Sequence, residues 1–241
     1  MTQTIDAAAF QQMVIHAAAA ISAQKQHIND LNVFPVPDGD TGTNMSLTIS
    51  AAAAELKKKQ CATVGEVAQT AASALLRGAR GNSGVILSLL FRGIAKSLKD
   101  RETIDGRDLA IALDFGVAAA YKAVMKPAEG TILTVSRLAA AQAAAAAREE
   151  NAAESVLEAA IREGQEALAD TINQNPVLKK AGVVDAGGKG FLVILQGMLD
   201  SLRGEPMPQV EEESAPADKA DFVAMAAEDI TFAFDTVFIV R

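Results

Sequence analysis

The sequence contains few of the residues that build disulfide-bonded, zinc-binding or membrane-spanning proteins. Among its 241 residues there are one cysteine, two histidines and no tryptophan. Cys61 alone cannot form an internal disulfide, and with His16 and His27 it leaves too few ligands for a structural zinc site. We therefore expect a protein of a reducing compartment and predict the cytoplasm. Apolar stretches such as Val85 to Phe91, which Arg92 ends, are too short to cross a bilayer, so we predict no transmembrane segment.

Aromatic residues are scarce as well. They make up 4% of the chain, whereas hydrophobic residues as a whole make up 50%, mostly Ala with Leu, Ile and Val. This composition is typical of closely packed helices rather than of a sandwich or barrel of strands, which draws on β-branched and aromatic residues. The formal net charge of -8 argues against a surface that neutralises nucleic-acid phosphates, so we predict no nucleic-acid partner.

Apolar residues recur with the helical period along most of the chain, which predicts an all-α domain. Thr131 is a plausible N-cap for the alanine-rich helix that follows Gly130. The other expected helices run from about Phe10 to Asn29, Asn44 to Lys59, Val85 to Leu98, Leu109 to Val124 and Leu157 to Ile172, with a last one carrying Leu192 to Leu202.

The composition changes after this helical part. Residues 204–228 include prolines and the run Glu211-Glu212-Glu213, which is typical of a flexible acidic linker. Residues 229–241 form the only strongly strand-like segment, and a single strand has nothing to pair with in a helical domain. We therefore expect residues 1–203 to form the helical domain and residues 229–241 to begin a further domain of a longer protein.

Two carboxylates flank a glycine in the segment that carries Asp38 and Asp40, directly after a stiff Pro-Val-Pro sequence. Like charges held close together favour a divalent cation, and oxygen ligands suit Mg²⁺ or Ca²⁺. An EF-hand loop is excluded because Thr43 and Ile49 stand where it needs glycine and glutamate. A haloacid-dehalogenase-like signature is excluded by Gly42, which stands where it needs Thr or Val. An acidic surface turn remains the alternative.

Two further glycine-rich segments precede apolar helical stretches. The first, residues 77–84, has the composition of a phosphate-binding loop, and Arg77 and Arg80 favour anion binding over a plain helix connector. It matches neither a Walker loop nor a dinucleotide fingerprint. The second, residues 185–190, is weak evidence alone, but loops at one end of a helical bundle can converge on one ligand. We assign no role to His16 or His27, and a nucleophilic role for Cys61 is not expected.

Four motifs in this order resemble a known family: Asn32-Val-Phe-Pro-Val-Pro-Asp-Gly-Asp-Thr-Gly-Thr-Asn-Met45, Arg77-Gly-Ala-Arg-Gly-Asn-Ser-Gly-Val85, Lys126-Pro-Ala-Glu-Gly-Thr-Ile-Leu-Thr134 and Val184-Asp-Ala-Gly-Gly-Lys-Gly190. They resemble the N-terminal domain of the bacterial fatty acid kinase catalytic subunit, which is similar to the nucleotide-binding L subunit of dihydroxyacetone kinase. The resemblance implies an antiparallel barrel of about eight helices, with ATP held at one rim.

The resemblance also implies a site. Asp38 and Asp40 would act in catalysis as ligands of Mg²⁺, and Asn32 would contribute its carbonyl oxygen near the place where related kinases use a third carboxylate. The residues expected to contact ATP are Thr41, Gly42, Thr43, Asn44, Arg80, Gly81, Asn82, Ser83, Gly84, Thr131, Asp185 and Gly187.

The implied activity is transfer of the γ-phosphoryl group of ATP to a fatty acid carboxylate, which a fatty-acid-binding partner protein presents, to give an acyl phosphate. A carboxylate acceptor needs no general base. We expect the chain to bind ATP and to need further domains and the partner for turnover; a homodimer is one arrangement that remains open. Two alternatives also remain: a kinase domain for dihydroxyacetone or a similar small ketone, and a non-enzymatic nucleotide-binding regulatory module.

Overall fold

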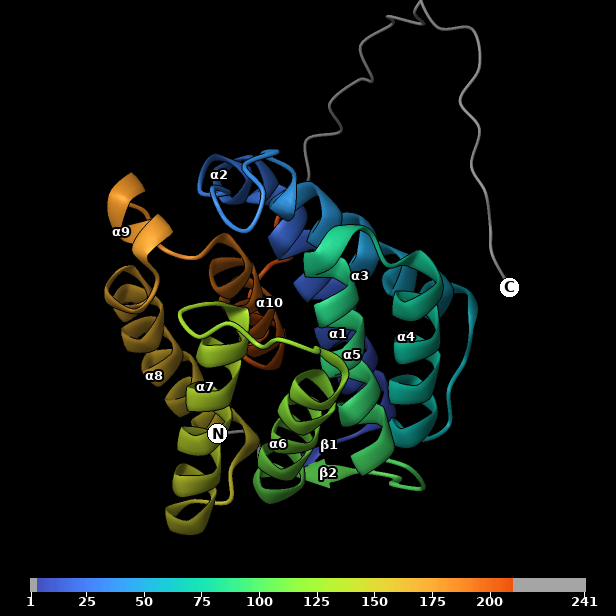
Figure 1. Ribbon diagram of the computed structural model, residues 1–241. Helices are drawn as coiled ribbons and strands as arrows, with labels where there is room; N and C mark the ends of the chain where they lie inside the picture. Colours follow the sequence, from blue (N-terminus) through green and yellow to red (C-terminus); the bar gives the residue numbers. More distant parts are fainter. Residues whose placement is uncertain (1–3, 210–241) are drawn as a thin grey trace, which may run out of the picture. The chain divides into compact units, whose positions relative to one another are not determined.

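Ten helices and one small two-stranded sheet make up residues 4–209, the part of the chain that the computed structural model describes (Figure 1). The strands β1 (Thr4–Ile5) and β2 (Ile104–Asp105) pair antiparallel. The helices are α1 (Ala7–Ala23), α2 (Lys25–Asp30), α3 (Thr41–Lys58), α4 (Val64–Gly78), α5 (Gly81–Ser97), α6 (Gly106–Ala123), α7 (Ile132–Glu149), α8 (Ala153–Gln174), α9 (Pro176–Ala181) and α10 (Ala186–Leu202). The predicted all-α class is confirmed.

The eight long helices form a closed cycle of packing contacts. Each packs against the next long helix along the chain, from α1 through α3, α4, α5, α6, α7 and α8 to α10, and α10 packs in turn against α1. The antiparallel barrel remains a prediction in its detail. The predicted terminal strand and most of the predicted linker lie outside the described residues. Among residues 4–209, no helix combines the length and hydrophobicity that crossing a bilayer requires.

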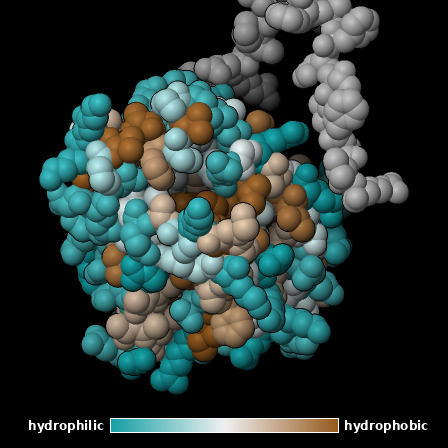
Figure 2. Space-filling view, in the orientation of Figure 1, coloured by the Kyte–Doolittle hydropathy of each residue, from teal (hydrophilic) through white to brown (hydrophobic). Residues whose placement is uncertain are grey.

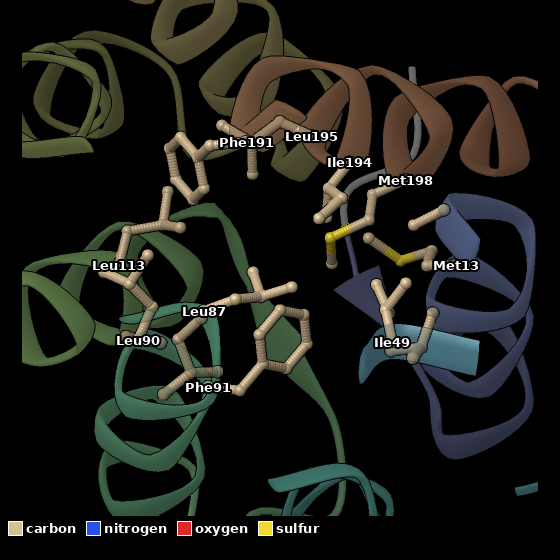
Figure 3. Close-up of a cluster of buried hydrophobic side chains, with 14 of the residues drawn as sticks. Met13, Ile49, Leu87, Leu90, Phe91, Leu113, Phe191, Ile194, Leu195 and Met198 are labelled. Carbon is tan, nitrogen blue, oxygen red and sulfur yellow. The ribbon is translucent and has the colours of Figure 1, made fainter. Parts of the chain in front are cut away.

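The core lies between α1, α3, α5, α6 and α10 (Figure 3). Met13, Leu87 and Ile49 are fully buried, and Phe191 and Ile194 are almost so. Each large apolar side chain withdrawn from water contributes about 1.5–3 kcal/mol. Small residues let the helices that carry this core approach closely. A Cβ atom on Gly93 of α5, for example, would lie 2.2 Å from the backbone oxygen of Phe115 in α6.

Three glycine-containing segments that the sequence suggests as loops contain the first turns of helices. Helix α3 begins at Thr41 and α5 at Gly81, so the predicted starts at Asn44 and Val85 are too late. Helix α10 begins at Ala186, so the expected loop at residues 185–190 is helical as well. Close packing explains the glycines better than loop flexibility does. A Cβ atom on Gly84 would lie 2.3 Å from the Thr48 hydroxyl oxygen, so only glycine fits there without displacing that hydroxyl group.

Several helices differ from the sequence-based prediction. The single helix expected up to Asn29 is divided at Gln24 into α1 and α2, and the short α9 is not predicted. Helix α4 is missed because alanine supplies half of its buried residues, and large apolar side chains are too few to show the helical period. A start signal was nevertheless present: the side chain of Thr63 caps the helix by accepting a hydrogen bond from the backbone N–H of Glu66 at 3.1 Å.

The contact between α5 and α6 makes a testable prediction at Gly93. Helix propensity alone favours Gly93→Ala by about 1 kcal/mol. The new methyl group would instead meet the backbone of α6, and overpacking of this kind costs about 1–3 kcal/mol. We expect Gly93→Ala to lower the free energy of unfolding in urea, whereas the exposed control Lys96→Ala on the same helix changes it by less than about 0.5 kcal/mol. A stabilised Gly93→Ala protein would contradict the close helix contact.

Candidate functional site

A cleft of about 530 Å³ opens where the first turns of α3, α5, α7 and α10 meet. The loop before α3 and the loop between α6 and α7 complete its walls. The lining residues are Asn32, Phe34, Pro35, Val36, Asp38, Asp40, Thr41, Asn44, Gly81, Asn82, Ser83, Val85, Ile86, Val124, Lys126, Ala128, Thr131, Ile132, Leu133, Asp185 and Gly187. Hydrophobic and hydrophilic side chains alternate on the face that carries the α6–α7 loop (Figure 2).

The loop from Leu31 to Asp40 presents two carboxylates to the cleft. Among the described residues, neither the Asp38 nor the Asp40 side chain has a hydrogen-bond or ion-pair partner, although both line the cleft. No third acidic, histidine or cysteine side chain within residues 4–209 joins them in a cluster that could hold a metal ion. Two open carboxylates nonetheless suit Mg²⁺, because this ion commonly keeps several waters and completes its shell with substrate phosphates.

Asn32 holds the acidic loop in place. Its side-chain oxygen accepts hydrogen bonds from both the backbone N–H and the hydroxyl group of Thr41, and its amide nitrogen donates to the backbone oxygen of Val36 at 2.7 Å. These two donors occupy both lone pairs of the Asn32 oxygen. The metal-ligand role predicted for Asn32 would therefore require its hydrogen bonds with Thr41 to be replaced.

A second asparagine, which the sequence analysis does not single out, ties the start of α3 to α2. The Asn29 side chain accepts from the backbone N–H of Thr43 and donates to the Thr43 hydroxyl, both at 3.0 Å. Beside this pair, a Cβ atom on Gly42 would lie 2.1 Å from the backbone oxygen of Lys25. Thr43 and Gly42 therefore support the site from behind, and they do not line the cleft.

The first turn of α5 offers open hydrogen-bond donors. Its N-cap Arg80 makes no side-chain cap, and among the described residues no acceptor is found for the backbone N–H groups of Gly81, Asn82 and Ser83. Unpaired N–H groups at a helix N-terminus attract anions. Gly81 has a positive φ of 56°, which favours glycine, and a Cβ atom there would lie 2.4 Å from the Asn44 side-chain nitrogen.

Two residues near this turn that are predicted to contact ATP do not line the cleft. Arg80 is exposed and does not line the cleft, and its backbone N–H donates to the Thr48 hydroxyl at 3.1 Å. Gly84 packs against Thr48 and likewise stays behind the lining. The remaining predicted residues of the site, from Asn32 to Gly187, are brought together at the cleft.

On the opposite wall of the cleft, the N-cap side chains of α7 and α10 accept hydrogen bonds from the first turns of these helices. Thr131 accepts from the backbone N–H of Leu133 at the start of α7, and Asp185 accepts from Gly188 at 2.7 Å at the start of α10. The Asp185 carboxylate also accepts a backbone hydrogen bond from Ile132. It is only 5% exposed, and burial raises its pKa to about 6 despite these hydrogen bonds.

Sequence reasoning missed several residues of the lining. Lys126 is part of one of the four motifs but is not singled out as a site residue, and it lines the cleft. Apolar side chains that flank the acidic loop and the start of α5, including Phe34, Val36 and Val85, line it as well. Helical periodicity identifies buried faces, and it does not reveal which exposed residues of separate loops meet.

Comparison with known proteins places these features in a family. The model of the DAK2 domain matches residues 35–200. Protein YloV of Bacillus subtilis is 44% identical over 99% of this chain, and an uncharacterised protein of Staphylococcus saprophyticus is 43% identical over 100% of it. The chain spans 44% and 45% of the length of these two relatives.

A solved structure has a similar fold. The dihydroxyacetone kinase of C. freundii, in complex with AMP-PNP and Mg²⁺, superimposes with a TM-score of 0.63 at 21% sequence identity. The match covers 83% of this chain and 35% of that kinase. At this identity the likeness establishes the fold.

The buried carboxyl group of Asp185 makes the stability of the protein depend on pH. Folding raises its pKa from an ordinary value of 3.8 to about 6, so the folded chain holds this proton more tightly than the unfolded chain does. The free energy of unfolding therefore decreases as the pH rises from about 3 to about 7, by about 3 kcal/mol in total from this group.

Asp185→Asn is the matched variant, because its side-chain oxygen can still accept from Gly188 but does not titrate. We expect the wild-type protein to lose about 2 kcal/mol of stability relative to this variant between pH 4 and pH 7, as measured by urea unfolding without nucleotide. Parallel pH profiles for the two proteins would show that Asp185 is not a buried titrating group.

Proposed function

The chain belongs to the DAK2 domain family, and from this premise we propose that it is the Mg²⁺-dependent ATP-binding domain of a kinase that phosphorylates a fatty acid carboxylate. The product would be an acyl phosphate, with the acceptor presented by a fatty-acid-binding partner protein. The observation that carries the proposal is the cleft itself, where two unpartnered carboxylates and the open N–H groups of α5 line one space.

A bound triphosphate needs hydrogen-bond donors for its oxygens and a cation for its charge, and the start of α5 and the acidic loop can provide these two things. The N–H groups of Gly81, Asn82 and Ser83 can donate to phosphate oxygens, with the positive end of the α5 dipole behind them. Asp38 and Asp40 would hold Mg²⁺, which supplies neutralisation of the phosphate charges when bound. Phosphoryl transfer depends mainly on positioning and charge neutralisation, and these residues provide both.

The nucleoside would lie toward the capped wall, near Thr131, Asp185 and Gly187. Thr131 and Asp185 are each committed to hydrogen bonds within the fold, so this wall keeps its shape whether or not a ligand is bound. Ile132 and Leu133 add apolar surface there, which suits a purine ring. The complex of C. freundii dihydroxyacetone kinase with AMP-PNP and Mg²⁺ supports this ligand class for the fold.

The acceptor assignment rests on the motif from Asn32 to Met45, which resembles that of fatty acid kinase subunits, and on acceptor chemistry. An ionised carboxylate is already a nucleophile at neutral pH, whereas a hydroxyl acceptor is helped by a base. No histidine or cysteine occurs among the described residues that line the cleft. The further domains that the longer relatives carry would bring the acceptor to this cleft. We propose the cytoplasm as its location and leave a homodimer as one arrangement.

The metal-bridged site is tested by titrating ATP into the chain in a calorimeter, with Mg²⁺ and with EDTA. We expect the Asp38→Asn/Asp40→Asn variant to bind ATP on the order of 100-fold more weakly in Mg²⁺, because the carboxylates that hold the ion are gone. The exposed Asp114→Asn on α6 is the control and should bind as the wild type does. Mg²⁺-dependent binding that is indifferent to the double substitution would overturn the assignment of the metal site.

The acceptor is tested with the longer protein that carries this domain, ATP, Mg²⁺ and a fatty-acid-loaded binding protein. Acyl phosphate is trapped with hydroxylamine, and parallel reactions contain dihydroxyacetone instead. We expect hydroxamate only in the fatty acid reaction, and we expect the double substitution to abolish it. Phosphorylation of dihydroxyacetone would favour the ketone kinase, and ATP binding without transfer to either acceptor would favour a regulatory module.

A further inference from the structure

We infer that Lys126 is a substrate-binding residue whose ammonium group contacts the terminal phosphate of the bound nucleotide, an inference that rests on the proposed nucleotide site. Lys126 is the only cationic side chain among the described residues that line the cleft. It forms no hydrogen bond or ion pair with any described residue. A charge that faces a cleft without a protein partner is available to a ligand.

The position of Lys126 places it at the phosphate end of the cleft. Helices α5 and α6 pack closely where Gly93 and Gly116 face the opposite backbone. The first turn of α5 and the residues directly after α6, including Val124, line the same cleft, so the two helices run in opposite directions. Lys126 follows α6 by three residues and lines the same cleft as Gly81, Asn82 and Ser83 at the start of α5.

The loop that carries Lys126 is held in place from outside the cleft. The Glu129 carboxylate accepts hydrogen bonds from Thr134 at 2.7 Å, from Arg137 at 3.0 Å and from the Tyr121 hydroxyl at 3.1 Å. Hydrogen bonding, above all from Thr134, lowers the pKa of Glu129, so the anchoring carboxylate stays charged at neutral pH. These bonds fasten the end of the loop to both α6 and α7.

Pro127 restrains the backbone directly after Lys126. Proline disfavours helical geometry in the residue that precedes it, so Lys126 cannot extend α6 and is directed to an extended conformation. Its neighbour Met125 is 99% exposed, whereas Lys126 lines the cleft. The loop thus fixes where the lysine side chain begins and leaves the ammonium group free to move toward a ligand.

Charge balance favours a phosphate as that ligand. A cation beside a helix N-terminus is electrostatically unfavourable unless an anion lies between them. Asp38 and Asp40 could supply that anion, but neither pairs with Lys126. If both carboxylates hold Mg²⁺, the terminal phosphate becomes the nearest group that can neutralise the lysine. Lysine suits this role as a point charge with three donors.

The test compares Lys126→Met with Lys126→Arg and with the control Lys122→Met. Lys122 is exposed on the last turn of α6 and does not line the cleft, so its loss removes the same charge from a neighbouring position. Dissociation constants for AMP-PNP, ADP and AMP are measured by calorimetry in Mg²⁺. Thermal unfolding of each variant establishes that it is folded, and it should be unchanged because Lys126 has no partner to lose.

We expect Lys126→Met to weaken AMP-PNP binding by about tenfold and AMP binding by less than about twofold, while Lys126→Arg keeps most of the affinity and Lys122→Met keeps all of it. Equal affinity of Lys126→Met and the wild type for AMP-PNP would overturn this inference and leave the nucleotide site standing. The same loss for AMP as for AMP-PNP would also overturn it. A folded wild-type chain that binds none of the three nucleotides would overturn the proposed function, and this inference with it.

Discussion

The unpaired N–H groups at the beginning of an α-helix are the constraint on which this site depends. Four long helices begin at one cleft, and each helix start needs acceptors that the helix itself cannot supply. Asparagine side chains serve α3, and Thr131 and Asp185 serve α7 and α10. Neither α3 nor α5 is capped by its own N-cap side chain, but of these four helices only α5 has no side-chain acceptor within residues 4–209 for any N–H group of its first turn, so its donors are available to a ligand.

Close packing between helices makes this convergence possible. Glycines such as Gly84 and Gly190 sit against the Thr48 and Met45 side chains of α3, and a Cβ atom at either position would require that side chain to move. Both glycines lie near the N-termini of α5 and α10. The close contacts that they allow with α3 therefore also determine where each of these helices begins relative to the cleft. A glycine-rich motif in this fold therefore indicates close packing between helices as much as it indicates a phosphate-binding loop.

The sequence predicts the helices whose buried faces carry leucine, isoleucine, valine or phenylalanine, because these residues make the helical period visible. It misses α4, where alanine hides the period, and it starts α3 and α5 too late, because glycines in a first turn look like a loop. The acidic motif and both glycine segments are correctly expected to converge. Asn29 and Lys126 are missed, since their roles depend on which loops meet in space, and neither spacing nor composition carries that information.

Asn32 illustrates the difference between a residue's chemistry and its use. Its amide oxygen has the chemistry of a metal ligand, and the resemblance to kinases suggests that role. In the fold both lone pairs are engaged by Thr41, so the residue works as a brace that keeps Asp38 and Asp40 directed at the cleft. The acidic loop is thereby ordered before any ligand arrives, which lowers the entropic cost of binding.

The anchor of the α6–α7 loop lies on the outer surface, away from the cleft lining. Tyr121, Glu129 and Arg137 meet there at the margin of the core, and none of them belongs to the lining. Substitutions of Glu129 or Arg137 can alter how firmly the loop is held without changing any residue of the cleft lining or of the buried core. The loop that carries Lys126 can therefore be loosened or tightened from the protein surface, through residues that would not themselves meet the ligand.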